Sequence, residues 1–257
     1  MDRLPPYSPC TERTISGKPA SVVGLVEETD KSKQRFYGHA LAERGYVVIA
    51  PDYWYYGKYH GGDYNPYQRG YASATMKGIW NHMLAIDLLE TLPEVDASRI
   101  GAIGQSLGGY NTLFLGTVDP RVKVMVSSCG YNSFYDYAAS EYGGGDLANW
   151  GIDKHMRRIR TVYGNDPARV PFDFPELLAG LAPRPVFTNA LAHDEYFSLP
   201  GVKKCLDAAR PVYELVGNAD DLPARFPDAG HNFPQAEREA AYEFLNQHLQ
   251  AEAPQRE

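Results

Sequence analysis

The sequence predicts an α/β protein with a mostly parallel sheet and helices on both faces. Short apolar, β-branched runs alternate with longer segments whose apolar residues recur at helical spacing, the order expected of consecutive βαβ units. Apolar residues make up 44% of the 257 residues, and no Pro/Gly/Ser-rich linker divides the chain. We therefore expect a single domain over 1–257, with an N-terminal arm at 1–20 and a tail at 251–257.

The first half of the chain supplies four predicted strands and three helices. The strands are short runs ended by turns, and they lie at 21–26, 46–51, 99–105 and 122–129. The helices lie at 33–45, 73–92 and 107–117, and the first ends on a glycine. The apolar residues at helical spacing in the second helix are Met76, Ile79, Trp80, Met83, Leu84 and Leu88.

The second half continues the alternation after one long interruption. Predicted strands lie at 185–190 and 211–216, and predicted helices at 175–181, 201–209 and 235–249. Residues 130–174 are too many for a simple connection. We expect them to form a cap-like insertion over the functional edge of the sheet.

Charge and cysteine content exclude several classes of partner. The net charge is −7, and Lys and Arg are scattered, so neither nucleic acid nor a membrane surface is indicated. Cys10, Cys129 and Cys205 form no CxxC and are expected as free thiols. Without a signal peptide or an apolar span the expected location is cytoplasmic, although a secreted protein whose leader has been removed would have the same sequence.

The pentapeptide "GQSLG" at 104–108 places Ser106 where a predicted strand passes into a helix. Three interpretations are open: Ser106 caps the helix, the glycines cradle a dinucleotide phosphate, or Ser106 is a nucleophile on a sharp turn. The glycines lack the GxGxxG spacing, and no Tyr-x-x-x-Lys follows, which disfavours the dinucleotide loop.

A nucleophilic serine requires two partners further along the chain. A histidine must accept its proton, and a carboxylate must hold that histidine, in the order Ser, Asp or Glu, His. Asp194 comes just past the strand at 185–190, and His231 directly precedes the final helix. Both positions lie beyond the carboxyl ends of strands, where open α/β sheets place their sites.

Other titratable residues remain as alternatives to these partners. The rival acids are Glu195, Asp220 and Asp221. Four histidines lie in helical or insertion contexts typical of packing or surface roles, namely His39, His82, His155 and His248. His193 and Asp194 suggest a metal pair, but adjacent side chains point apart and no HExxH is present, so we expect no metal.

An aromatic segment at 52–71 contains eight tyrosine or tryptophan residues among glycines. Together with the insertion it is expected to line the pocket for the acyl or alcohol group, because aromatic faces suit sugar rings and phenolic acids. The candidate binding residues are Tyr53, Trp54, Tyr55, His60 and Trp150. The same tyrosines could equally serve only to cover the sheet.

Taken together, these motifs resemble the α/β-hydrolase superfamily. Over about residues 20–250 the chain is most similar to the dienelactone hydrolase and acetyl xylan esterase branch, through "LAERGYVVIAPDYWYYG", "RIGAIGQSLGGYNTLFL", "LAPRPVFTNA" and "PDAGHNFP". The resemblance implies Ser106 as nucleophile, Asp194 as acid and His231 as base, with no cofactor. It also implies an oxyanion hole built from the backbone N–H of Leu107 and a second N–H, which we assign to Glu28.

The chain departs from this pattern in two ways. Dienelactone hydrolases have a cysteine where this chain has Ser106, so their lactone chemistry is not expected. Only about 20 residues precede the first parallel strand, so we expect either a trimmed sheet or an edge completed by a partner chain, as in a homo-oligomer.

The expected function is that of a serine carboxylic-ester hydrolase acting on a small-molecule or carbohydrate-linked ester. Two alternatives remain at this point. One is a peptidase or amidase of prolyl-oligopeptidase type, which uses the same triad order. The other is a binding protein that keeps the fold without turnover.

Overall fold

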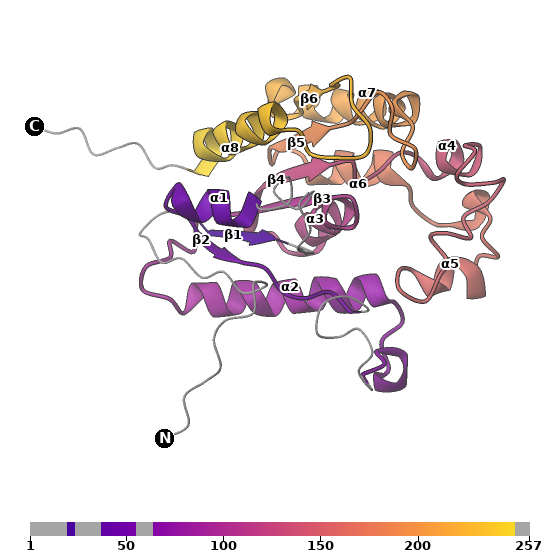
Figure 1. Cartoon of the computed structure of the whole chain (residues 1–257), viewed down its shortest axis with the longest axis horizontal. Helices are drawn as coiled ribbons and strands as arrows, with labels where there is room; N and C mark the ends of the chain where they lie inside the picture. The colour runs from indigo at the N-terminus through magenta and orange to yellow at the C-terminus, as the bar shows by residue number, and fades with distance from the viewer. Residues whose placement is uncertain (1–19, 24–36, 55–63, 250–257) are drawn as a thin grey trace, which may run out of the picture.

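The computed structural model describes residues 20–23, 37–54 and 64–249, and at 20–23 it describes the backbone alone. Six strands form one sheet in the order β2-β1-β3-β4-β5-β6, and every pair is parallel (Figure 1). The strands are β1 Ala20–Val23, β2 Val47–Ile49, β3 Ile100–Gln105, β4 Val122–Ser128, β5 Val186–Asn189 and β6 Ala224–Arg225. The predicted parallel α/β architecture is confirmed.

Helices cover both faces of the sheet. α1 and α8 bury one cluster of apolar residues, and α2, α3, α6 and α7 bury the other. The helices are α1 Tyr37–Glu43, α2 Ala74–Glu90, α3 Leu107–Val118, α4 Phe134–Ala138, α5 Arg157–Thr161, α6 Phe174–Leu181, α7 Leu199–Leu215 and α8 Gln235–Leu249, with 3₁₀ turns η3 Tyr67–Arg69, η4 Pro167–Arg169 and η5 Ala219–Asp221. Within the described ranges, no helix is both long and apolar enough to cross a bilayer.

The prediction of a strand at 211–216 is wrong. These residues belong to α7, which continues through Pro211 as far as Leu215. Its buried residues lie on one helical face, and they are Gly201, Val202, Cys205, Leu206, Ala209 and Tyr213. The β-branched run therefore extends a helical face. The last strand is instead β6, whose two residues are too few to produce a readable pattern.

The exposed face of α2 also differs from what the sequence pattern predicts, because it contains most of the large apolar residues. Four of the apolar residues that mark this helix in the sequence are exposed, at 46% for Met76, 47% for Trp80, 46% for Leu84 and 41% for Leu88. The buried face is formed mainly by smaller residues, which are Ala74, Thr75, Gly78, Ile79, His82, Ala85, Ile86 and Leu89. Small residues lie here because α2 packs closely: a Cβ at Gly78 would come within 2.5 Å of the ring of Tyr53.

The predicted insertion at 130–174 contains α4, α5 and η4 and leads directly into α6. In Figure 1 these helices lie beyond the arrowheads of β3 and β4, at the carboxyl edge of the sheet. The insertion begins against the start of α3, because a Cβ on Gly109 would lie 2.8 Å from the Cα of Gly130. The backbones of α3 and the insertion can meet only because both residues lack a side chain.

Candidate active site

Ser106 occupies a strained turn between β3 and α3. Its backbone angles are φ 54° and ψ −116°, a conformation that L-residues rarely adopt. A Cβ at Gly104 would lie 2.1 Å from the carbonyl of Gly108, so the turn can be this sharp only with glycine there. The Ser106 N–H donates to the carbonyl of Ser128 on β4 at 2.8 Å, which fixes the turn to the neighbouring strand.

The Ser106 hydroxyl does not cap the helix. Although Ser106 is the N-cap residue of α3, its side chain accepts no capping hydrogen bond. It faces a cavity that His231 also lines. The helix-cap interpretation of the pentapeptide is therefore wrong, and the side chain is left available for chemistry.

Asp194 and His231 form a buried acid–base pair. His231 Nδ1 lies 2.9 Å from Asp194 Oδ2, and their side chains are 11% and 1% exposed. The other carboxylate oxygen of Asp194 accepts the backbone N–H groups of Tyr196 at 2.8 Å and Phe197 at 3.1 Å. Because three donors hold the carboxylate, it can fix the imidazole with Nδ1 protonated and leave the second nitrogen as a base.

The rival acids lie elsewhere. Glu195 is exposed to solvent. Asp220 and Asp221 belong to η5, and Asp221 approaches His248 at 3.9 Å instead of His231. Of these carboxylates, only Asp194 contacts the histidine that shares a cavity with Ser106.

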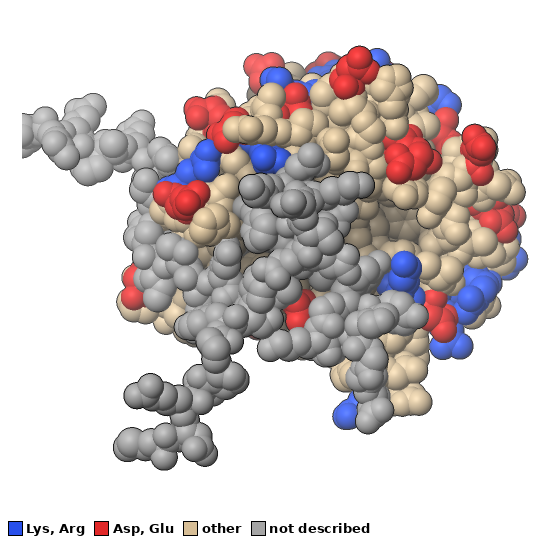
Figure 2. Space-filling model, in the orientation of Figure 1, with Lys and Arg blue, Asp and Glu red and all other residues tan. Residues whose placement is uncertain are grey.

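The cavity beside Ser106 has a volume of about 410 Å³, within the range of small-molecule sites. Figure 2 shows a hollow beside α4 and α5, and the visible residues around it are mostly uncharged. Rings dominate the lining, and the aromatic residues are Tyr37, Tyr110, Tyr137, Tyr142, Trp150, Tyr196 and Phe197. Polar side chains between them come from Gln105, Asn149, Lys154 and His155.

The insertion forms one wall of this cavity. Seven of its residues line the cavity, and they are Tyr137, Tyr142, Asn149, Trp150, Ile152, Lys154 and His155. The indole of Trp150 is 3% exposed, and its Nε1 has no partner among the described residues. A buried N–H donor without a partner is costly, and this one has almost no surface open to the cavity.

His155 contributes a neutral ring to this wall. Burial, helped by the charge of neighbouring Lys154, lowers the pKa of His155 to about 4. A neutral imidazole offers one acceptor nitrogen, and the hydroxyl of Tyr110 lies 2.8 Å from Nδ1. His155, for which the sequence indicated only a packing or surface role, therefore ties the insertion to α3 and also faces the cavity.

The structure separates the predicted binding residues into three groups. Trp150 lines the cavity, as expected. Leu107, the first residue of α3, lines it as well. Tyr53 and Trp54 do not match the prediction, because they are only 2% and 9% exposed and pack in the interior. The Tyr53 hydroxyl donates to the carbonyl of Lys154 at 3.2 Å, and the Trp54 indole donates to the carbonyl of Tyr64 at 2.8 Å. Glu28, Tyr55 and His60 lie outside the described residues.

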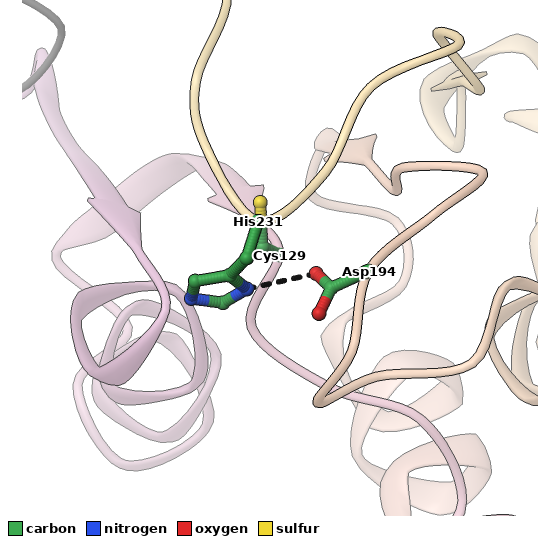
Figure 3. Close-up of side chains that lie close together, drawn as sticks. All are labelled: Cys129, Asp194 and His231. Atoms are coloured by element: carbon green, nitrogen blue, oxygen red, sulfur yellow. Dashed lines mark hydrogen bonds and ion pairs between the residues drawn. The ribbon is translucent and has the colours of Figure 1, made fainter.

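Cys129 is a site residue that the sequence pattern did not indicate. It follows β4 at a positive φ of 47°, is buried, and has its sulfur 2.9 Å from the carbonyl oxygen of Asn232, next to His231 (Figure 3). Burial, followed by the nearby charge of Asp194, raises the pKa of its thiol far above the usual range. The thiol is therefore protonated and can donate to that carbonyl.

These three side chains also provide a set of potential metal ligands. One ligand atom each from Cys129, Asp194 and His231 lies within 4.8 Å of the others. In the part of the chain that the structure describes, however, each is already engaged: the carboxylate accepts three hydrogen bonds and the thiol is protonated. Zinc requires thiolate, so hydrogen bonding accounts for this cluster better than a metal does. His193 points away from it and pairs with Asp228 at 2.6 Å.

Comparisons with known proteins identify the family. The family model described as "Glucuronyl esterase, fungi" matches residues 55–217, which is more than half of the chain. The chain belongs to the glucuronyl esterase family. It is thus a serine-type carboxylic-ester hydrolase of the α/β-hydrolase superfamily, as predicted, in a family that the motif comparison did not single out.

Individual proteins similar to this chain include two named for glucuronoyl ester hydrolysis and one named only as a hydrolase. A glucuronoyl esterase of carbohydrate esterase family 15 from Caldicellulosiruptor kristjansonii superposes with a TM-score of 0.73 at 23% identity, over 95% of this chain and 71% of that one. The 4-O-methyl-glucuronoyl methylesterase 1 of Wolfiporia cocos is 27% identical over 69% of this chain, which spans about half of that protein, 47%. The YtaP protein of Bacillus subtilis is 26% identical over 88% of this chain and 72% of its own length.

Several wall residues could not have been chosen from the sequence. Tyr196 packs edge-on against the His231 ring, with 4.6 Å between ring centroids. Tyr142 in turn packs against Tyr196, with 4.7 Å between ring centroids, and this contact links the insertion to the loop that contains Asp194. The one available signal was the position of Tyr196 two residues after the acid, where an aspartate commonly accepts the N–H of residue i+2.

Proposed function

We propose that this chain hydrolyses an ester of a sugar acid through an acyl-enzyme on Ser106. The observation that carries the proposal is the arrangement of the strained Ser106 and the Asp194-held imidazole of His231 in one aromatic cavity. Relatives named for glucuronoyl ester hydrolysis support the choice of a sugar acid.

The proposed reaction begins with attack of Ser106 Oγ on the ester carbonyl. His231 Nε2 takes the hydroxyl proton while Nδ1–H donates to Asp194, and the imidazolium then gives the proton to the leaving alcohol oxygen. Water, deprotonated by the same nitrogen, attacks the acyl-enzyme and releases the acid and Ser106. In Figure 3 the second ring nitrogen of His231 points away from Asp194, which leaves it free for this exchange.

The developing oxyanion needs hydrogen-bond donors at the start of α3. The Leu107 N–H is in the first turn, where helices leave N–H groups without an intrahelical acceptor. The helix dipole adds a favourable positive potential at this end. We assign the second donor to Glu28, as the resemblance implies.

The lining of the cavity favours a sugar-acid ester over a long acyl chain. Aromatic faces can stack on a pyranose ring, and Gln105 and Asn149 supply polar contacts for its hydroxyl groups. An esterified carboxyl group carries no charge, so the mostly uncharged lining suits the substrate. The carboxylate released at the end of the reaction would then lie near Lys154.

The experiment compares four substrates on the parent and Ser106→Ala. These are methyl 4-O-methyl-glucuronate, p-nitrophenyl acetate, methyl ferulate and a dipeptide p-nitroanilide. We expect the largest kcat/KM on the sugar-acid ester, no turnover by the variant, and fluorophosphonate labelling of the parent alone. Preferred cleavage of the anilide would instead establish a peptidase, and a folded parent that resists labelling would contradict Ser106 as nucleophile.

A further inference from the structure

The outward face of α2 carries an apolar row that is exposed in the described part of the chain and that the proposed reaction does not use. Met76, Trp80, Leu84 and Leu88 are each 41–47% exposed and follow one another at intervals of four residues. Such a row is a ridge about 18 Å long on the helix surface. The water-facing side of a helix is normally polar, so four large apolar residues in one ridge mark a contact surface. In Figure 1, α2 lies along the outside of the molecule.

The ridge is complementary to a second copy of itself. If two α2 helices meet antiparallel about a two-fold axis at the level of position 82, Met76 of one copy faces Leu88 of the other, and Trp80 faces Leu84. Ridges built from residues four apart interdigitate when helices cross at about −50°, the commonest packing class in globular proteins. A two-fold contact of this kind uses the same patch on both copies and closes on itself.

Charges beside the ridge favour the same antiparallel register. Lys77 lies next to one end, and Asp87 and Glu90 lie next to the other. About the same axis, Lys77 of one copy comes opposite Asp87 of the second copy, whose side chain is 56% exposed while it pairs with Arg121. Lys77 is half-buried, and its ammonium group also contacts Asn81 and the rings of Tyr64 and Tyr71. A parallel arrangement would instead bring the two acidic ends together in a protein with a net charge of −7.

We infer that α2 is a self-association surface through which two copies of this chain form an antiparallel, two-fold dimer. The contact centres on Trp80 and Leu84 and is flanked by Lys77 and Asp87. Four apolar side chains per copy form a small interface, so the dimer is expected to be weak and in the micromolar range. This inference is independent of the proposed function.

Sedimentation of the full-length chain from about 5 to about 500 µM, a range that brackets a micromolar affinity, tests the dimer. Trp80→Glu should weaken association by at least about thirtyfold, the effect of losing a central aromatic anchor. The control is Leu215→Glu, which changes the most exposed large apolar side chain of the described residues, at 85%, on another helix and should leave association unchanged. Thermal unfolding and ester turnover verify that both variants are folded.

A charge-swap cycle tests the register. Lys77→Glu and Asp87→Lys should each weaken the dimer severalfold, and the double variant should recover most of the loss, because the swapped charges again face each other. A parent chain that stays monomeric throughout the range overturns the inference. If Trp80→Glu associates as strongly as the parent, this face is not the contact and the inference is overturned. If the losses in the double variant are additive, the antiparallel register is excluded, which also overturns it.

Discussion

The two sides of the active-site cavity are held by different forces. On one side, Asp194 and His231 follow β5 and β6 and are positioned by hydrogen bonds. On the other, the insertion presents Trp150 through ring packing, with 4.9 Å between its ring centroid and that of Tyr110 and 5.5 Å to that of Phe134. The Asp194–His231 pair therefore depends on a few directional contacts, whereas the shape of the cavity depends on many weak ones.

The largest effect on turnover should come from a substitution on the side of the cavity that holds Ser106, Asp194 and His231. Ser106→Ala should lower kcat by about a millionfold, because nucleophile and base act as a unit. Unfolding temperature should be almost unchanged, since the Ser106 hydroxyl makes no capping bond. Stopped-assay kinetics and calorimetry measure the two quantities. A large drop in unfolding temperature would show that this side is held by Ser106 itself.

The next largest effect is expected from a substitution of Asp194, the proposed acid. Asp194→Asn should lower kcat by about ten-thousandfold, through loss of the correct His231 tautomer. Glu195→Gln, one residue along and exposed, is the matched control and should have little effect. If Glu195→Gln proved as damaging, the hydrogen-bond geometry would not describe the working acid.

Two tryptophans sharpen the contrast between the cavity wall and the core. Trp150→Phe shortens a ring that lines the cavity, so kcat/KM on a sugar-acid ester should fall about tenfold, as expected for lost stacking area worth about 0.5–1.5 kcal/mol. Turnover of p-nitrophenyl acetate should change much less. Trp54→Phe removes the donor to Tyr64 and should lower stability by about 1 kcal/mol without changing the ratio between the two substrates. Equal behaviour of the two variants would mean that Trp150 has no role in specificity.

A further expected effect concerns stability toward acid and not turnover. Burial lowers the pKa of His82 to about 4, and burial with Lys154 does the same for His155. Because an unfolded histidine titrates near 6.5, the unfolded chain binds more protons between about pH 6.5 and pH 4. The free energy of unfolding should therefore fall as the pH falls through this window, by up to about 1.4 kcal/mol per pH unit for each histidine.

Urea unfolding at pH 7 and pH 5 measures this slope. His82→Leu should make the free energy of unfolding less sensitive to pH. The control is Leu84→Gln, which lies on the exposed face of the same helix and should leave the slope as it is in the parent. A parent slope near zero would contradict neutral, buried histidines.

Local patterns predicted the reacting side well because its rules act over a few residues. A serine between glycines at the end of a strand fixes the turn at Ser106, and loops after parallel strands meet at one edge, so Asp194 and His231 could be chosen by position. α3 and α8 were also found nearly to the residue. Whether these three side chains carry the reaction as assigned remains a prediction that the variants above test.

The cavity wall could not be predicted, because its contacts join residues far apart in the chain. Tyr142 meets Tyr196, and His155 meets Tyr110, through packing that no local spacing encodes. The same limit explains the error at Trp54, whose aromatic neighbours suggested a ligand face although Trp54 packs against Tyr67 and donates to the carbonyl of Tyr64. β6 was not predicted because it has only two residues, which are recognised as a strand only by their pairing with β5.

The contact between Gly109 and Gly130 has a consequence for exchanging parts between relatives. With a would-be Cβ of one only 2.8 Å from the Cα of the other, the helix that follows Ser106 and the start of the insertion must fit each other without side chains. An engineer who wishes to transplant a new substrate wall should therefore cut after Gly130 and before Phe174, leaving both glycines with the recipient. Within those cut points, a donor segment should keep the contacts that Trp150 and His155 make with Tyr110 of α3.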